Sequence, residues 1–218
     1  MKAILFDLDG TLIDSSEGIT KSAQYALAHF GIYEPDLTKI YFFIGPPLID
    51  TFMNHYGFSR EQAVEAVAVY RERYHKVGIF ECSLYPGVKE CIEELKRQGY
   101  MIGMASSKPE ESCRRILEHF GILGLFDDVV GATMDGRIDT KEEVLNEVMR
   151  RWSEIPKEEM CLIGDTMFDI DGANMVGVPS IAVSFGFGNV DEMLKAGAKT
   201  VIGDLRELPA KIKEIFQR

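Results

Sequence analysis

Residues 2–12 of the chain read KAILFDLDGTL. The run Lys2–Phe6 is short and, after its first residue, uniformly apolar, which is typical of a strand buried on both faces of a parallel sheet. Two acids, Asp7 and Asp9, come directly after this run, and Gly10 follows them. The stretch therefore predicts a buried strand that carries carboxylates at its carboxyl end.

Short apolar runs of this kind recur along the chain, and most of them precede an amphipathic, helix-like pattern. The further runs are Tyr100–Ala105, Val129–Val130, Met160–Gly164, Pro179–Val183 and Thr200–Ile202. The helix-like stretches are Val88–Gln98, Pro109–Phe120, Lys141–Trp152, Phe168–Val176 and Leu205–Phe216. Alternating strands and helices favour right-handed crossovers. The predicted fold class is α/β, with a doubly wound parallel sheet.

One long segment breaks this alternation, because residues 15–82 contain helical patterns and no clear buried strand. The expected helices are Glu17–Phe30, Leu48–His55 and Arg60–Gly78. The turn Tyr85-Pro86-Gly87 marks the return to the sheet. We therefore expect a core domain made of residues 1–14 and 83–218, and a small all-helical domain inserted at 15–82.

The overall charge limits the classes of partner. The chain has 218 residues, and its 35 acidic residues against 24 basic ones give a net charge of −11. Such a surface repels nucleic-acid phosphates and anionic lipids, and no basic run compensates for it.

No apolar stretch approaches the roughly 18 residues that a membrane span requires. The four cysteines are scattered, which favours reduced thiols. We expect a cytoplasmic protein that binds neither nucleic acid nor membrane.

Polar side chains follow several of the predicted strands at the point where each strand ends. Asp7 and Asp9 follow the first strand, Ser106 a central one and Asp165 another, with Asp169 one helical turn further on. Ligands of open parallel sheets bind beyond these carboxyl ends. Carboxylates that converge in one crevice repel each other unless their pKa values rise or a cation binds. Hard oxygen ligands of this kind indicate Mg²⁺.

The same edge supplies the parts that a phosphoryl transfer needs. Lys141 begins a predicted helix there, where its ammonium group could bridge a carboxylate and a phosphate. A carboxylate nucleophile, a metal, a hydroxyl, a cation and a second carboxylate would then lie together. Because an alkoxide leaving group benefits from protonation, an acid at Asp9 favours ester hydrolysis over dehalogenation.

These residues resemble the motifs of the haloacid dehalogenase superfamily. The stretch from Phe6 to Leu12 contains the DxDGT signature, and Gly164–Asp169 contains GDxxxD. Ser106 and Lys141 fall at the second and third motifs. The insertion resembles the helical cap of the phosphoglycolate phosphatase-like subgroup. The resemblance implies a Rossmann-like core and a Mg²⁺-dependent phosphatase.

The resemblance also implies roles for the two acids of the first motif and for the metal ligands. Asp7 would attack phosphorus and become an aspartyl-phosphate. Asp9 would protonate the leaving oxygen, then deprotonate the attacking water, and its main-chain carbonyl would bind Mg²⁺. Asp165 would complete the metal ligands with Asp7, while Asp169 would hold a metal-bound water or Lys141, and Thr11 would support the site.

The remaining implied roles concern the phosphate and the leaving group. Ser106 and the Ser107 amide would hold the phosphoryl oxygens, and Lys141 would neutralise their charge. Arg137, four residues upstream, is the rival for the role of Lys141. The cap would close over the crevice and contact the substrate.

The sequence leaves several readings of the substrate and the activity open. The expected substrate is a small phosphorylated metabolite, with phosphoglycolate first, a nucleoside monophosphate as an alternative, and a phosphosugar mutase as a further one. The stretch Phe185–Gly188 lacks the tyrosine that we associate with phosphoglycolate phosphatases. A non-catalytic binding protein is a minor alternative. Such a protein should have lost at least one of the motif residues, and all of them are present in this sequence. The chain could be a monomer or a homodimer.

Overall fold

The computed structural model describes residues 1–216, and it divides the chain into two compact units. One unit consists of Met1–Ile13 and Leu84–Arg218, and the other of Asp14–Ser83. The short strands β2 (Ile13–Asp14) and β3 (Ser83–Leu84) pair with each other at the points where the chain passes between the units.

The first unit is built on a parallel sheet with the strand order β5-β4-β1-β6-β7-β8. Its strands are β1 (Ala3–Phe6), β4 (Met101–Pro109), β5 (Asp128–Ala132), β6 (Met160–Gly164), β7 (Ser180–Val183) and β8 (Val201–Ile202). Ala3 of β1 pairs with Met101 on one side and with Met160 on the other. The three central strands β4, β1 and β6 are thus parallel and begin at the same level, so their carboxyl ends lie at the same edge of the sheet.

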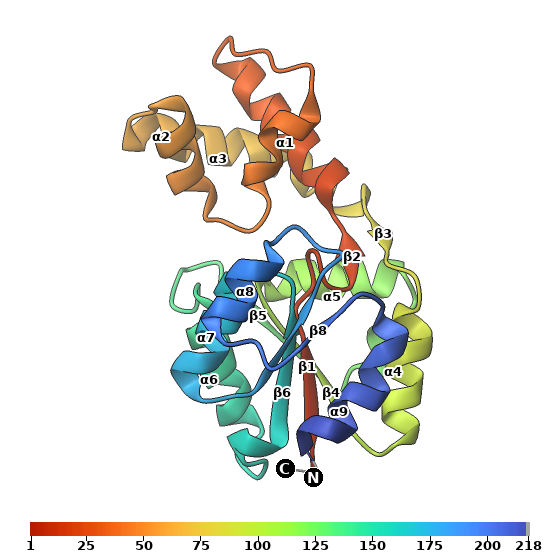
Figure 1. Ribbon diagram of the computed structural model, residues 1–218. Coiled ribbons are helices and arrows are strands. Elements are labelled where there is room, and N and C mark those ends of the chain that lie inside the picture. The colour runs from red at the N-terminus through yellow and green to blue at the C-terminus, as the bar shows by residue number, and fades with distance from the viewer. Residues whose placement is uncertain (217–218) are drawn as a thin grey trace. The chain divides into compact units, whose positions relative to one another are not determined.

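Helices cover both faces of this sheet (Figure 1). They are α4 (Val88–Arg97), α5 (Glu110–His119), α6 (Lys141–Arg151), α7 (Met167–Val176), α8 (Val190–Ala196) and α9 (Leu208–Phe216). Helices α6 and α7 pack against each other on one face, and α4 and α9 pack against each other on the opposite face. Because both faces are covered, β1 is buried along its whole length. The α/β doubly wound fold class is confirmed.

Two helical segments of this unit differ from the sequence-based expectation. The helix α8 was not expected; it has seven residues, of which only Met193 is buried, so its apolar periodicity is weak. The predicted helix 205–216 is divided into a 3₁₀ turn, η5 (Leu205–Glu207), and α9. The side chain of Asp204 caps the turn by accepting a hydrogen bond from the Arg206 amide at 2.8 Å.

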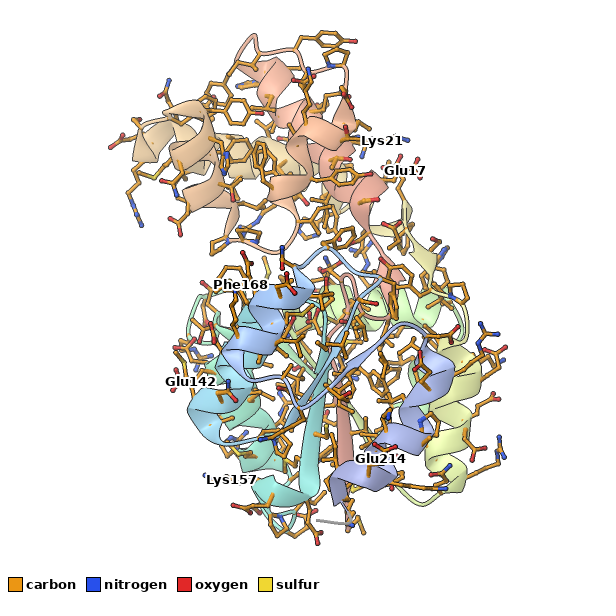
Figure 2. The ribbon with its side chains drawn as sticks, in the orientation of Figure 1. Glu17, Lys21, Glu142, Lys157, Phe168 and Glu214 are labelled. Carbon is orange, nitrogen blue, oxygen red and sulfur yellow. The ribbon has the colours of Figure 1, made fainter. Side chains whose placement is uncertain are left out.

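The second unit is helical. It contains α1 (Ser16–His29), η1 (Leu37–Phe43), α2 (Leu48–Tyr56), α3 (Arg60–Tyr74) and η2 (Gly78–Phe80). Ser59 and Gln62 form a capping box that begins α3. On α1, Lys21 and Glu17 form an exposed ion pair one helical turn apart (Figure 2).

None of the helices in residues 1–216 combines the length and the apolar character that crossing a bilayer requires. All four cysteines are free thiols.

Candidate active site

The loop after β1 places the first pair of acids. The Asp7 amide donates to the Ile163 carbonyl oxygen at 2.9 Å, which ties the end of β1 to β6. The chain then turns back at Gly10, whose φ of +80° is the left-handed conformation that glycine tolerates best. A Cβ atom at Gly10 would lie 2.0 Å from Asp165 Oδ2. Glycine is therefore required here both for the turn and for the close approach of Asp165.

Asp165, at the end of β6, is held by two neighbouring loops. Thr11 Oγ1 lies 3.4 Å from Asp165 Oδ1, and the Phe187 amide donates to Oδ2 at 2.8 Å. A Cβ atom at Gly186 would lie 2.3 Å from Asp165 Cβ. The glycine-rich stretch after β7 is thus a missed part of the site. The sequence feature that could have indicated it is the presence of Gly186 and Gly188 just after a strand, and not the missing tyrosine.

Lys141 is the first residue of α6, and its side chain enters the buried centre of the site. Its Nζ lies 2.6 Å from Asp7 Oδ1, 2.7 Å from Asp169 Oδ1 and 2.8 Å from the Ala105 carbonyl oxygen. These three acceptors account for all three protons of an ammonium group. A cation at a helix N-terminus opposes the helix dipole. The two carboxylates offset that cost.

Asp169 links the lysine to the following helix. Its Oδ2 accepts hydrogen bonds from the Thr166 amide at 3.0 Å and the Thr166 hydroxyl at 2.8 Å, which begins α7 with a capping box. Its Oδ1 faces Lys141. Asp169 thus contacts Lys141, one of the two partners that the resemblance implies for it.

Three buried acids lie close enough to share a cation. One carboxylate oxygen from each of Asp7, Asp165 and Asp169 lies within 4.8 Å of the others. Burial raises the pKa of Asp7 to about 6, with Lys141 opposing the rise, and burial together with the charges of Asp169 and Asp7 raises the pKa of Asp165 to about 8. Burial would lower the pKa of Lys141, but the charges of Asp169 and Asp7 raise it above its usual value. Hard, desolvated oxygen ligands with excess negative charge fit Mg²⁺.

Asp9 forms an ion pair with a residue of β4. Its Oδ2 lies 2.7 Å from Nζ of Lys108, a residue that was not singled out from the sequence. Ser106 is buried, and its Oγ accepts a hydrogen bond from the Lys108 amide at 3.3 Å. Ser107 is exposed. The strand β4 continues through these residues to Pro109, so Ser106 lies within the strand and not after it.

The rival to Lys141 lies elsewhere. The Arg137 side chain is 81% exposed and forms an ion pair with Asp135 at 2.6 Å. Lys141, by contrast, is buried and donates to the Asp7 carboxylate. Of the two candidates, the structure brings Lys141 to the acids.

The family of the chain is shown by its sequence. The model of the haloacid dehalogenase-like hydrolases matches residues 4–183, which include both aspartate motifs. The chain belongs to this family. It is 46% identical over 191 residues to a 5′-nucleotidase from Pseudomonas aeruginosa, which covers 87% of this chain and 86% of that one. It is 35% identical to the tyrosine-protein kinase PtkA of Mycobacterium tuberculosis, over 94% of this chain and 71% of that one.

Further haloacid dehalogenase-like relatives extend this comparison. A phosphoglycolate phosphatase from Aliivibrio fischeri is 27% identical, over 94% of this chain and 92% of that one. The crystal structure of a predicted phosphatase from Clostridium acetobutylicum superimposes with a TM-score of 0.92 and 41% identity, and covers 98% of both chains. The expected resemblance to this family is confirmed.

Proposed function

We propose that this hydrolase is a Mg²⁺-dependent phosphatase that cleaves small phosphomonoesters through an aspartyl-phosphate on Asp7. The observation that carries the proposal is the setting of Asp7 at the end of β1. Its carboxylate is buried, bound by an ammonium group at 2.6 Å, and within reach of two further acids that could share a cation with it. A carboxylate in such a setting is suited to attack an anionic phosphorus centre once the repulsion between them is neutralised.

Each neighbouring side chain has a proposed task. The Asp7 oxygen attacks phosphorus, and Lys141 holds Asp7 and offsets charge on the phosphoryl group. Asp9 gives a proton to the leaving oxygen, and later takes one from the water that hydrolyses the aspartyl-phosphate. Ser106 and the Ser107 amide are proposed to bind phosphoryl oxygens.

The proposed metal ligands are the Asp7 and Asp165 carboxylates and the Asp9 main-chain carbonyl. Asp169 is proposed to support the site through Lys141, because its Oδ1 lies 2.7 Å from the Lys141 ammonium group and its Oδ2 caps α7. When bound, Mg²⁺ would neutralise charge on the phosphate and hold it against Asp7. From the resemblance to capped members of the haloacid dehalogenase superfamily, the helical unit is proposed as the cap that contacts the leaving group.

Nucleoside 5′-monophosphates are the first substrates to test. The 46% identity to a 5′-nucleotidase is much higher than the 27% identity to a phosphoglycolate phosphatase. The stretch Phe185–Gly188 also lacks the tyrosine associated with the latter, and its Phe187 contributes to the site through the main chain. Both observations favour a nucleotide over phosphoglycolate.

The test is phosphate release from nucleoside monophosphates, 2-phosphoglycolate, sugar phosphates and 4-nitrophenyl phosphate, with Mg²⁺ or with EDTA. We expect Asp7→Asn to lose at least about a hundredfold of the activity, since an amide cannot act as the nucleophile. Substantial activity in Asp7→Asn would contradict the role of Asp7. Turnover of a sugar phosphate without phosphate release would indicate a mutase, and no turnover of any compound a binding protein.

A further inference from the structure

A second lysine enters the site beside Asp9. Lys108 Nζ lies 2.7 Å from Asp9 Oδ2, and the two side chains are only 9% and 17% exposed. The other oxygen, Asp9 Oδ1, is buried and has no hydrogen-bond partner within residues 1–216. A buried carboxylate oxygen without a partner costs free energy. The two oxygens of Asp9 therefore have different surroundings, one anchored and one without a donor.

An irregularity in β4 places this lysine. Ser106 pairs with Gly131 of β5, yet the next paired residue of β4 is Pro109, opposite Ala132. Ser107 and Lys108 are thus extra residues on β4, and such bulges redirect side chains next to active sites. Gly131 makes room for the bulge, because a Cβ atom there would lie 2.5 Å from the Lys108 carbonyl oxygen. The backbone of two strands is adapted to the position of Lys108.

We propose that Lys108 is a positioning residue for Asp9, an inference that rests on the proposed phosphatase function. Lys108 holds Oδ2, so that Oδ1 is the oxygen through which Asp9 transfers its proton. As the Asp7 oxygen forms its bond to phosphorus, the bond from phosphorus to the leaving oxygen breaks, and its electron pair stays on that oxygen. The leaving oxygen takes the proton from Asp9 Oδ1, and the carboxylate that results is paired with the Lys108 ammonium.

The two lysines then have separate tasks. Lys141 contacts Asp7 and Asp169, whereas Lys108 forms an ion pair with Asp9. Loss of Lys141 should slow the transfer of the phosphoryl group from any phosphate ester to Asp7. Loss of Lys108 should harm only those reactions in which the leaving oxygen needs a proton.

Leaving groups of different basicity test this difference. An alkoxide requires protonation as it leaves, while 4-nitrophenolate leaves without it. For Lys108→Met we expect kcat/KM to fall about tenfold to a hundredfold with an alkyl phosphate, and less than about threefold with 4-nitrophenyl phosphate. The comparison uses kcat/KM because kcat also contains the hydrolysis of the aspartyl-phosphate, in which Asp9 acts again. Lys108→Arg, which keeps a cation, should restore part of the loss.

Two further variants separate the possible results. Lys96→Met removes a lysine–aspartate pair at the opposite edge of the sheet, and it should leave kcat/KM unchanged for both substrates. In Asp9→Asn, the addition of Lys108→Met should cause no further selective loss, since the group that Lys108 positions is already disabled. The melting temperature of each variant controls for folding.

The outcomes distinguish the inference from the function on which it rests. An equal fall with both substrates in Lys108→Met would place Lys108 on the phosphoryl group, and would overturn the inference, as would no change or a fully additive effect in the double variant. If Asp9→Asn itself showed no dependence on the leaving group, the proton-donor role of Asp9 would be wrong, and the inference with it. An inactive wild-type protein would overturn both.

Discussion

The two edges of the core sheet carry ion pairs of the same chemical kind in different surroundings. At the carboxyl edge, the side chains of Lys141 and Asp7 are 5% and 10% exposed. At the amino edge, Lys96 and Asp127 form a pair at 2.8 Å whose side chains are 33% and 34% exposed. Solvent screens the second pair, so it contributes little to stability. The first pair is desolvated, so each of its members depends on the other.

The contrast in burial indicates which edge of the sheet holds the reactive groups. Buried, mutually repelling acids raise each other's pKa values and destabilise the folded state until a cation or substrate binds. The amino edge has no such cluster among the described residues. We therefore expect variants at the carboxyl edge to change activity and metal response, and variants at the amino edge to change neither.

The largest effect should come from Lys141→Met. The substitution leaves Asp7 and Asp169 buried without their cation, and it removes the charge proposed to offset the phosphoryl oxygens. We expect kcat/KM to fall about a thousandfold or more, equivalent to roughly 4 kcal/mol, for alkyl and aryl substrates alike. Steady-state kinetics on protein shown to be folded by circular dichroism would measure this. Lys141→Arg is the charge-preserving control, and retention of a tenth of the activity by Lys141→Met would contradict the assignment.

The next effect concerns pH and Mg²⁺. Burial raises the pKa of Asp7 from 3.8 to about 6 and that of Asp165 from 3.8 to about 8. Between the lower and the raised pKa of each acid, the metal-free folded state binds more protons than the unfolded state. The free energy of unfolding without metal should therefore decrease as pH rises through 6 and 8. Mg²⁺ binds the ionised carboxylates, so the stabilisation that it gives should grow over the same range.

Melting temperatures in EDTA and in Mg²⁺ at several pH values would measure this dependence. Each 1 kcal/mol corresponds to a shift of roughly 2–4 °C for a protein of this size. Asp165→Asn should flatten the dependence on both pH and Mg²⁺. A Mg²⁺ shift that stayed constant with pH would contradict a metal held by these acids.

The fold was predictable where burial leaves a simple signature. The run Met160–Gly164 matches β6 residue for residue, because it is uniformly apolar and ends at an acid. The helix α8 was missed because it buries one side chain. The end of β4 was set too early because Ser106 and Lys108 look like loop residues, although the strand continues through them.

The candidate site was predictable as far as parallel topology alone determines it. Asp7 and Asp165 end neighbouring strands and must meet at one edge, and Lys141 begins a helix over that edge. The contact between Lys108 and Asp9 depends on a bulge, which has no sequence period. The Phe187 amide contributes through its main chain, so its residue type carries no signal.

The smallest effect should come from Lys96→Met, which breaks the exposed pair at the amino edge. Lys96 Nζ also donates to the Leu125 carbonyl oxygen, but Asp127 Oδ2 keeps its hydrogen bond from the Ile102 amide at 2.7 Å after the lysine is removed. We expect the free energy of unfolding to change by less than about 1 kcal/mol, with kcat/KM and the Mg²⁺ response unchanged. Denaturant unfolding and steady-state kinetics would measure this. A loss of activity comparable to that of Lys141→Met would mean that burial does not set the difference between the two edges.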